Sequence, residues 1–183
     1  PATDALVIGA GIAGAAVAAS LARRGWRVRV LDQGSAPAAG ASGLPAGLFA
    51  PHVSPDDSVV SRLSRSGVRT TLQTAADGLQ EGTDWQPSGV LQHHVDGKRG
   101  LPADWDAGPG ADWSHAAPDV LRQEAGIPAD VRATWHPRAG WIRPAQLVRA
   151  LLAQPGVQFQ GDAKVSKLAR VGTPDGTPGL WHA

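Results

Sequence analysis

Residues 5–32, ALVIGAGIAGAAVAASLARRGWRVRVLD, decide how this chain folds. The apolar run Ala5–Ile8 is typical of a buried strand, and the glycines within residues 9–14 predict a tight turn. Residues 12–24 are rich in alanine and lack proline, which favours a helix, and Gly25 suits a helix C-cap. Trp26–Leu31 then alternate arginine with valine or leucine, as a second strand does. The sequence therefore predicts a strand, a helix and a second strand in succession.

The turn has the glycine spacing of a dinucleotide-binding site, GAGIAG. Gly9 allows the tight turn, Gly11 lets the backbone approach a pyrophosphate, and Gly14 lets the helix pack closely on the strand. Helix N-terminal N–H groups would hold the pyrophosphate, and Asp32 would accept hydrogen bonds from a ribose and disfavour the 2′-phosphate of NADP. The glycines alone are a weak signal for a dinucleotide site. Their place between a strand and a helix, with an acidic residue at the end of the second strand, makes this interpretation strong.

Composition places the chain among globular proteins. It has 183 residues, 42% of them hydrophobic, with 17 Lys and Arg against 16 Asp and Glu, so its charge indicates no partner. Cysteine is absent, which excludes disulfides and thiolate metal sites. The uncharged run Ala5–Ala22 is interrupted by glycines and follows no basic region, so we expect a cytoplasmic protein without a membrane segment. The lack of any methionine predicts that Pro1 is an excised boundary and that the chain is truncated.

Further elements follow from periodicity and from the positions of Gly and Pro. Gly34–Pro51 is expected to be an irregular loop, and Pro144 suits the first turn of a helix. In the Asp57–Leu79 helix, apolar residues lie on or near one face: Val60, Leu63, Val68 and Leu72. We expect helices at Asp57–Leu79, Ala117–Glu124 and Arg143–Leu152, strands at Gly89–Val95, Val131–Trp135, Val157–Phe159 and Ala163–Val171, then a turn at Gly172–Gly179 and a strand starting at Leu180.

Three segments resemble one known family. Residues 39–51, AGASGLPAGLFAP, resemble the loop after the second strand in the D-amino-acid oxidase and glycine oxidase superfamily of FAD-dependent oxidoreductases. Trp85–Leu91 and the segment HPRAGWIRPAQLVRALL, which starts at His136, continue the resemblance over most of the chain. Within the superfamily the same features resemble the C-terminal oxidoreductase domain of bifunctional proteins that modify the wobble uridine of tRNA.

The resemblance implies an α/β fold. It predicts an incomplete Rossmann-type FAD-binding domain, three-layered with a parallel sheet, at residues 1–84 and 138–183. Residues 85–137 would form part of an antiparallel-sheet substrate domain. In this family the next strand returns to the Rossmann sheet and the substrate-binding and catalytic residues lie largely beyond it, so no catalytic residue is predicted here.

The resemblance also implies which residues bind FAD. The ADP half would lie on Gly9, Gly11, Gly14 and Asp32, the flavin side on Ser42, Gly43 and Gly47, and the adenine against the backbone of Val165. Their neighbours complete the predicted cofactor site: Ala10, Ile12, Gln33, Ala41 and Leu48. Leu44-Pro45 departs from the asparagine-containing pair that the family has after its GASG segment.

The implied reaction is oxidation of an amine: a hydride leaves the carbon next to nitrogen for the flavin, and the imine then hydrolyses. The substrate would be the carboxymethylaminomethyl group of a tRNA wobble uridine. The alternatives are a small amino acid (glycine, sarcosine or a D-amino acid) and a flavin-domain fragment without enzymatic activity. An NAD-dependent dehydrogenase is disfavoured, because the GASG-type loop has no role there.

Other patterns favour structural roles. His93 and His94 are adjacent on a predicted strand and point to opposite faces without a third ligand, so no metal site is expected. Asp56-Asp57 suit a helix N-terminus better than a catalytic carboxylate pair. The seven tryptophans are dispersed, which favours packing over base stacking, and the arginines of residues 23–29 are expected to be solvated. No G-x-S-x-G segment supports a hydrolase.

Overall fold

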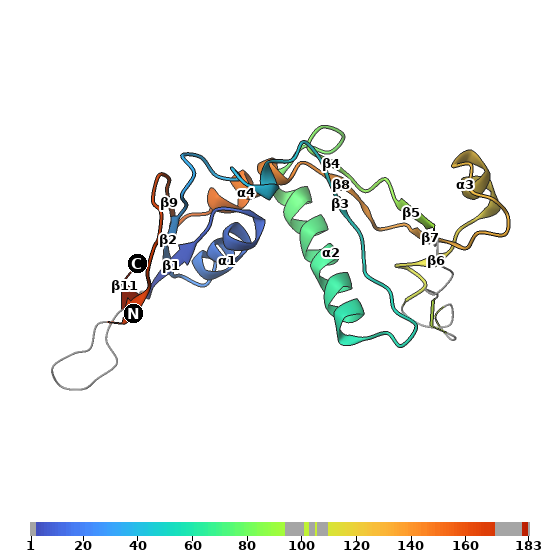
Figure 1. Cartoon of the computed structure of the whole chain (residues 1–183), viewed down its shortest axis with the longest axis horizontal. Helices are drawn as coiled ribbons and strands as arrows, with labels where there is room; N and C mark the ends of the chain where they lie inside the picture. Colours follow the sequence, from blue (N-terminus) through green and yellow to red (C-terminus); the bar gives the residue numbers. More distant parts are fainter. Residues whose placement is uncertain (1–2, 94–100, 103–104, 106–109, 171–180, 183) are drawn as a thin grey trace. The chain divides into compact units, whose positions relative to one another are not determined.

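The computed structural model describes residues 3–93, 101–102, 105, 110–170 and 181–182 (Figure 1). These residues form two compact units. The first combines Pro1–Pro45 with Pro144–Ala183, and the second is Ala46–Arg143. The predicted division into cofactor and substrate domains has different boundaries and stays a prediction about function.

The first unit contains the strand-helix-strand segment predicted from residues 5–32. Strand β1 (Asp4–Ile8) leads into helix α1 (Ile12–Ala22), and β2 (Arg27–Leu31) lies parallel to β1. Strand β9 (Val157–Gln160) joins the other edge of β2, also in parallel, so the order is β1-β2-β9. An α/β fold with a parallel sheet is thereby confirmed. Because α1 ends at Ala22 with Arg23 as its C-cap, Gly25 (φ +85°) belongs to the following turn.

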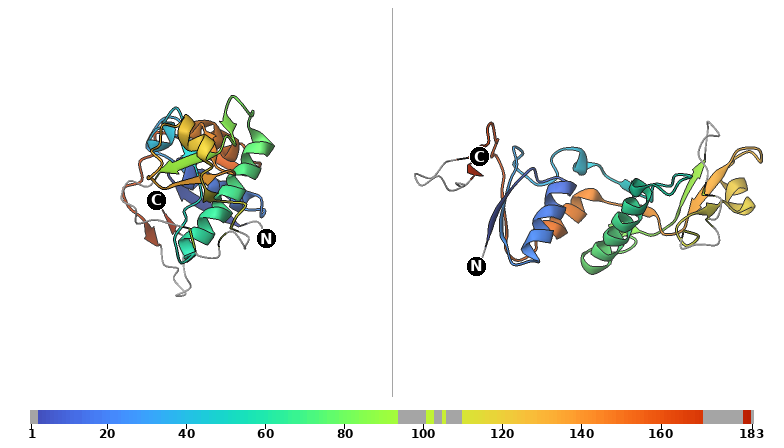
Figure 2. Two further views of the ribbon diagram at one scale, coloured as in Figure 1. Left: turned by 90° about the vertical axis from the view of Figure 1, so that its right-hand side faces the viewer. Right: turned by 90° about the horizontal axis from the view of Figure 1, so that it is seen from below.

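Small side chains let the helices of this unit pack closely. Helix α1 buries Ala15, Ala18 and Ala19, and it packs against β2 and against α4 (Pro144–Leu152). Helix α4 was predicted at Arg143–Leu152, and the expected place of Pro144 in its first turn is confirmed. Figure 2 shows α1 and α4 next to each other beside the sheet. Val28 and Val30 of β2 are buried at the centre of this core.

The second unit is built around two antiparallel sheets. One has the order β3-β8-β4, from Gly47–Phe49, Gly140–Ile142 and Trp85–Gln86. The other has the order β5-β7-β6, from Val90–His93, Ala133–His136 and His115–Ala116. Helices α2 (Val59–Gly78) and α3 (Asp119–Glu124) complete the unit. The antiparallel sheets agree with the predicted fold class.

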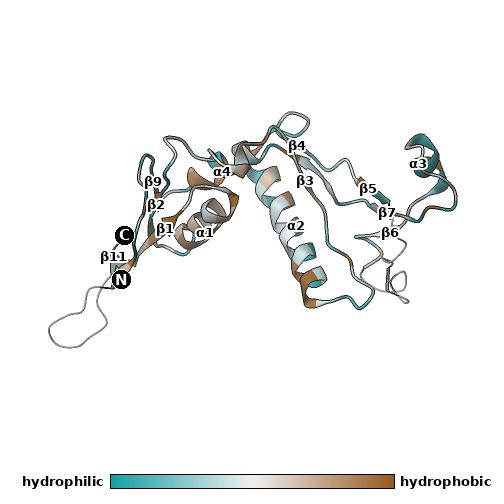
Figure 3. Ribbon diagram, viewed as in Figure 1, coloured by the Kyte–Doolittle hydropathy of each residue, from teal (hydrophilic) through white to brown (hydrophobic). Residues whose placement is uncertain are grey.

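Helix α2 was predicted correctly, but its buried face was predicted only in part. Val68 is buried, together with Ser61 and Ala75, whereas Val60 and Leu63 are 61% and 66% exposed. Figure 3 shows the apolar first turn of α2 in brown. The actual buried residues are spaced seven apart, and two of them are small enough for close packing, which a search for large apolar side chains overlooks.

Other sequence expectations were wrong in detail. Gly34–Pro51 is not wholly irregular, because it contains a 3-10 turn, η1 (Ala41–Gly43), and strand β3. Among the described residues of the predicted strand Ala163–Val171, only β10 (Ala169–Arg170) is paired as a strand, with β11 (Trp181–His182), and Val171 lies outside the described residues. Strands β4, β6 and β8 were missed, because two or three residues are too few for a period to be recognised. His94, Val95, the turn at Gly172–Gly179 and Leu180 lie outside the described residues.

In the part of the chain that the structure describes, no helix combines the length and the apolar character needed to cross a membrane.

Candidate cofactor site

The glycine turn between β1 and α1 adopts the geometry that its sequence predicts. Gly9 has a φ of +98°, a conformation that side chains disfavour, and its N–H donates to the carbonyl of Leu31 at 2.7 Å. A Cβ on Gly14 would lie 1.9 Å from the carbonyl oxygen of Gly9. Only glycine therefore allows α1 to begin this close to the turn.

Asp32, just beyond the end of β2, is tied to the backbone on both sides. Its Oδ2 accepts a hydrogen bond from the N–H of Ala10 at 2.6 Å, and its Oδ1 accepts one from the N–H of Gly34 at 2.8 Å. A carboxylate has about four lone-pair positions, so both oxygens can still accept hydrogen bonds from a ligand. The backbone thus holds the carboxylate in one orientation for hydroxyl donors.

The 3-10 turn η1 meets the start of α1. The hydroxyl oxygen of Ser42 accepts a hydrogen bond from the N–H of Ile12 at 3.0 Å, and a Cβ on Gly43 would lie 2.6 Å from the carbonyl oxygen of Ala38. Ala38 itself is buried, and its N–H donates to the carbonyl of Ala10 at 3.0 Å. These contacts attach the GASG-type loop to the glycine turn, and the Ser42 hydroxyl can still donate its own proton.

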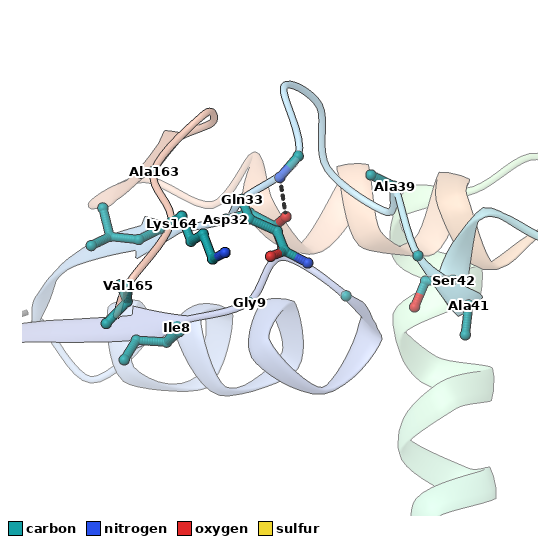
Figure 4. Close-up of a pocket in the computed structure, with 14 residues that line it drawn as sticks. Ile8, Gly9, Asp32, Gln33, Ala39, Ala41, Ser42, Ala163, Lys164 and Val165 are labelled. Atoms are coloured by element: carbon teal, nitrogen blue, oxygen red, sulfur yellow. Dashed lines mark hydrogen bonds between the residues drawn. The ribbon is translucent and has the colours of Figure 1, made fainter. Parts of the chain in front are cut away.

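A cavity of about 460 Å³ lies among these elements (Figure 4). The segment after β9 forms one side of it, held by a hydrogen bond from the N–H of Ala163 to the carbonyl of Asp32 at 2.8 Å. Figure 4 shows Lys164 and Val165 on this side and Ser42 and Ala41 across from them. The lining residues are Ile8, Gly9, Gly11, Leu31, Asp32, Gln33, Gly34, Ala39, Gly40, Ala41, Ser42, Ala163, Lys164 and Val165.

Seven of the predicted cofactor residues line this cavity: Gly9, Gly11, Asp32, Gln33, Ala41, Ser42 and Val165. Four others do not line the cavity but make the contacts given above that hold the glycine turn, the GASG-type loop and Asp32 in place: Ala10, Ile12, Gly14 and Gly43. Gly47 and Leu48 belong to the second unit, where Gly47 pairs with Ile142 of β8 and Leu48 lines another cavity. Because no ligand is present, the role of each residue toward FAD stays a prediction.

Lys164, which is exposed and lines the cavity, was not predicted as a site residue. It follows β9 within an unpaired segment that was expected to be a strand, and no motif surrounds it. The signal that could have found it is its position one residue before Val165.

The polar groups around the cavity fit the ADP part of a dinucleotide. Helix α1 has no acidic residue of its own in its first turn, and its dipole has its positive end at this turn. The helix end and the ammonium group of Lys164 suit a pyrophosphate, and the fixed carboxylate of Asp32 suits ribose hydroxyls.

The remaining candidates have structural roles. Trp85, Trp105 and Trp113 are buried, and arginine side chains stack on two of them: Arg65 on Trp105, with Arg69 and Arg138 on Trp113. Packing was the expected role for these tryptophans. The arginines of residues 23–29 are exposed, as predicted. Among the described residues, no cluster of three His, Cys, Asp or Glu side chains could hold a metal ion.

The expectation of helix capping by Asp56-Asp57 was wrong in detail. Ser58 is the N-cap of α2, and its hydroxyl accepts from the N–H of Ser61 at 3.3 Å. Asp57 instead binds Arg65 through two hydrogen bonds of 2.7 and 3.0 Å, and this guanidinium holds the pKa of the Asp57 carboxyl below its ordinary value.

Comparison with known proteins agrees with the site. Residues 4–180 match the model of the family described as DAO, FAD dependent oxidoreductase. The chain belongs to this family of FAD-dependent oxidoreductases, as its sequence segments suggested.

Two relatives are more specific. The chain is 61% identical to the tRNA 5-methylaminomethyl-2-thiouridine biosynthesis bifunctional protein MnmC of Verminephrobacter eiseniae, covering 100% of this chain and 30% of that protein. It is 62% identical to the protein of the same name from Paracidovorax citrulli, covering 97% of this chain and 28% of that protein. The chain therefore spans less than a third of the length of these relatives.

Solved structures of the same fold include two glycine oxidases. The enzyme from Geobacillus kaustophilus has a TM-score of 0.67 at 20% identity, over 91% of this chain and 48% of that chain. The enzyme from Bacillus cereus has a TM-score of 0.64 at 20% identity, over 92% of this chain and 48% of that one. At this identity the likeness establishes the fold alone.

Proposed function

We propose that this chain binds FAD at the glycine turn and forms the flavin-binding part of an enzyme that oxidises a C–N bond. The proposed substrate is the carboxymethylaminomethyl group of a tRNA wobble uridine. The observation that carries the cofactor assignment is the cavity at the turn, where a fixed carboxylate and the N-terminus of α1 lie together. The names of the MnmC relatives support the tRNA substrate, which would place the activity in the cytoplasm.

Bound FAD would supply the hydride acceptor for the reaction. The chain's own groups bind and orient it. Backbone N–H groups at the start of α1, with the Ser42 hydroxyl, would hold the pyrophosphate. Asp32 would accept hydrogen bonds from the adenosine ribose, and Val165 would contact the adenine through its backbone.

The proposed reaction needs FAD as the hydride acceptor and one molecule of water. The carbon between the substrate's nitrogen and its carboxylate loses a hydride, and the nitrogen loses a proton, which leaves an imine. Water then adds to the imine carbon, and the C–N bond breaks to give the amine on the uridine and glyoxylate. The residues that act on the substrate proton are not assigned to this chain.

The first test is the absorbance spectrum of the purified complete protein, followed by denaturation and identification of the released cofactor. Flavin absorption and release of FAD are expected. A protein that stays folded but colourless after incubation with FAD would contradict the cofactor assignment and favour a fragment without enzymatic activity.

The second test is anaerobic mixing with tRNA that carries the carboxymethylaminomethyl group. Bleaching of the flavin and release of glyoxylate are expected. If glycine, sarcosine or a D-amino acid bleached the flavin while the tRNA did not, the substrate would be a free amino acid.

A further inference from the structure

Helix α2 concentrates positive charge in a unit that is acidic as a whole. The second unit, Ala46–Arg143, contains nine Arg and Lys against twelve Asp and Glu. Within α2, in contrast, three arginines precede Asp77, which lies in the last turn and is the only acidic residue of the helix. Charge is therefore segregated within this unit, and one helix carries the basic part.

We propose that Arg62 and Arg69 of α2, together with Arg138, form a contact surface for the phosphodiester backbone of an RNA. These three residues are called the arginine surface below. The identification of RNA rests on the proposed function, in which a tRNA carries the reacting group. Binding of RNA is measured without turnover, so the surface and the proposed function can fail separately.

Arg62 and Arg69 lie on one face of α2. They are seven residues apart, which corresponds to about two turns and roughly 10 Å along the helix axis. Both are exposed, and neither makes an ion pair within the part of the chain that the structure describes. Exposed Ser66 lies between them on the same face, so its hydroxyl is a further donor there.

The ring of Trp113 brings Arg69 and Arg138 together. Their guanidinium carbons lie 5.3 and 4.9 Å from the centroid of this ring, and Trp113 itself is buried. Two like charges at one ring repel each other, and stacking on the indole offsets part of that repulsion. Asp112 contacts Arg138 at 3.3 Å and does not contact Arg69, so the group keeps a net positive charge. A phosphate at this place would neutralise it.

Arg65, on the same helix, is instead paired within the unit. Its side chain is 15% exposed, and it donates two hydrogen bonds to Asp57, of 2.7 and 3.0 Å. Its guanidinium carbon also lies 5.0 Å from the centroid of the Trp105 ring. Arg65 therefore stabilises the fold and is not part of the arginine surface. Arg62 and Arg69 have no carboxylate partner of this kind among the described residues.

A phosphodiester backbone suits this arrangement of charges. A guanidinium group binds phosphate oxygens through parallel N–H donors, and stacking on an aromatic ring fixes its plane before the ligand arrives. Charges two helical turns apart suit a ligand whose own charges repeat along a chain. Because Trp113 is buried, its ring is not available for stacking with bases. The arginine surface would therefore hold the RNA backbone without reading its sequence.

The first test is binding of tRNA without the carboxymethylaminomethyl group to the complete FAD-loaded protein, followed by fluorescence anisotropy at several salt concentrations. We expect Arg69→Gln to raise the Kd about fivefold, and the double variant Arg62→Gln/Arg69→Gln to raise it about twentyfold. Each lost arginine should lower the slope of log Kd against log salt concentration by about one. The control is Arg132→Gln, because Arg132 is exposed, belongs to the same unit and stacks on no ring among the described residues. Equal effects of Arg132→Gln and Arg69→Gln, or no tRNA binding by the wild type, would overturn the proposal.

The second test seeks a gain of affinity, which damage to the fold cannot produce. Asp112→Asn removes the carboxylate that contacts Arg138 and leaves its guanidinium free for a phosphate. We expect the Kd for tRNA to fall about threefold. Asp130→Asn removes the same charge from another exposed position of the unit and should leave the Kd unchanged. A Kd of Asp112→Asn at or above the wild-type value, or an equal fall in Asp130→Asn, would contradict the arginine surface.

Turnover separates the arginine surface from the proposed function. With carboxymethylaminomethyl-tRNA as substrate, Arg62→Gln/Arg69→Gln should raise KM about tenfold or more and change kcat less than about threefold. If both proteins oxidise this tRNA with the same KM, the surface proposal fails while the proposed function stands. If tRNA binds through the arginines but the wild type does not oxidise it, the proposed function fails and the surface stands. Displacement of the tRNA by polyglutamate at an equal concentration of charges would assign the surface to an acidic protein and overturn the RNA proposal.

Discussion

The two cavities are built from different parts of the chain. At the turn of residues 9–14 the backbone forms the site. Glycines allow the close approach of the chain segments, and backbone N–H groups hold the Asp32 carboxylate. Beside the cavity of the second unit, at the β5–β7 pair, side chains form a hydrogen-bond network that joins Gln92, Ser114 and His136. The backbone site has no room for a Cβ at Gly14 or Gly43. A side-chain network is weakened when a single partner is removed, because a buried polar group is then left without its hydrogen bond.

The largest effect is expected from filling the backbone site. In Gly14→Val the Cβ would lie 1.9 Å from the carbonyl oxygen of Gly9, so α1 must move away from the turn. We expect loss of bound FAD and a free energy of unfolding lower by about 3 kcal/mol. Extraction of FAD and urea denaturation measure the two effects.

A matched control is Gly67→Ala in helix α2, where an added Cβ would have no neighbour within 4 Å. This change should stabilise the protein by about 1 kcal/mol, because alanine is the better helix former. Retention of FAD by Gly14→Val at the wild-type level would show that the turn does not depend on close packing.

Removal of the central group of the side-chain network should have the next largest effect. His136→Leu leaves the buried Ser114 hydroxyl without its imidazole partner, and we expect the free energy of unfolding to fall by about 2 kcal/mol. Thermal denaturation followed by circular dichroism measures this. The partly exposed His115 provides the control. If His136→Leu and His115→Leu lost the same free energy of unfolding, the hydrogen bonds of the network would not be what stabilises the fold at His136.

Asp32→Asn tests whether the backbone site needs a charged acceptor. Asparagine offers one oxygen and places an NH₂ group against the N–H of either Ala10 or Gly34. We expect a loss of about 1.5 kcal/mol in stability and a weaker affinity for FAD by about tenfold. Fluorescence titration of the apoprotein with FAD measures the affinity, and exposed Asp4→Asn should leave it unchanged. Wild-type affinity in Asp32→Asn would remove Asp32 from the proposed cofactor site.

The smallest effect concerns the ion pair at the start of α2. Because Arg65 lowers the pKa of Asp57, this carboxylate stabilises the fold above its unfolded pKa, and the contribution disappears as the pH falls through its lower folded pKa. Asp57→Asn should therefore cost about 0.5 kcal/mol at pH 7, since the pair is partly exposed, and nothing below that folded pKa.

Asparagine also suits the backbone at this position, because Asp57 has a φ of +45°. Asp162→Asn is the control: Asp162 has a φ of +52° and makes no ion pair within the described part of the chain. A loss in Asp57→Asn that is the same at acid and neutral pH would exclude the ion pair as its cause. Urea denaturation at both pH values measures it.

Sequence alone was sufficient for the parts of the fold with local signals. Glycine spacing, alanine content and alternating apolar residues predicted β1, α1 and β2, and Pro144 marked the start of α4. The short strands β4, β6 and β8 carry no such signal, because pairing with distant strands is what keeps them extended. The prediction of a strand at Ala163–Val171, after β9, was wrong for a related reason. Its apolar alternation resembles a strand, but residues 163–168 pair with no neighbouring strand among the described residues.

What the sequence by itself determined is the glycine turn, the acid at the end of β2 and the membership in the FAD-dependent oxidoreductases. These features depend on backbone conformation within a short segment, and glycine is the residue that allows it. Only the tertiary structure brought Lys164 to the first cavity and joined Gln92, Ser114 and His136 beside the second. These residues lie far apart along the chain, and their contacts depend on strand register, which local sequence patterns do not specify.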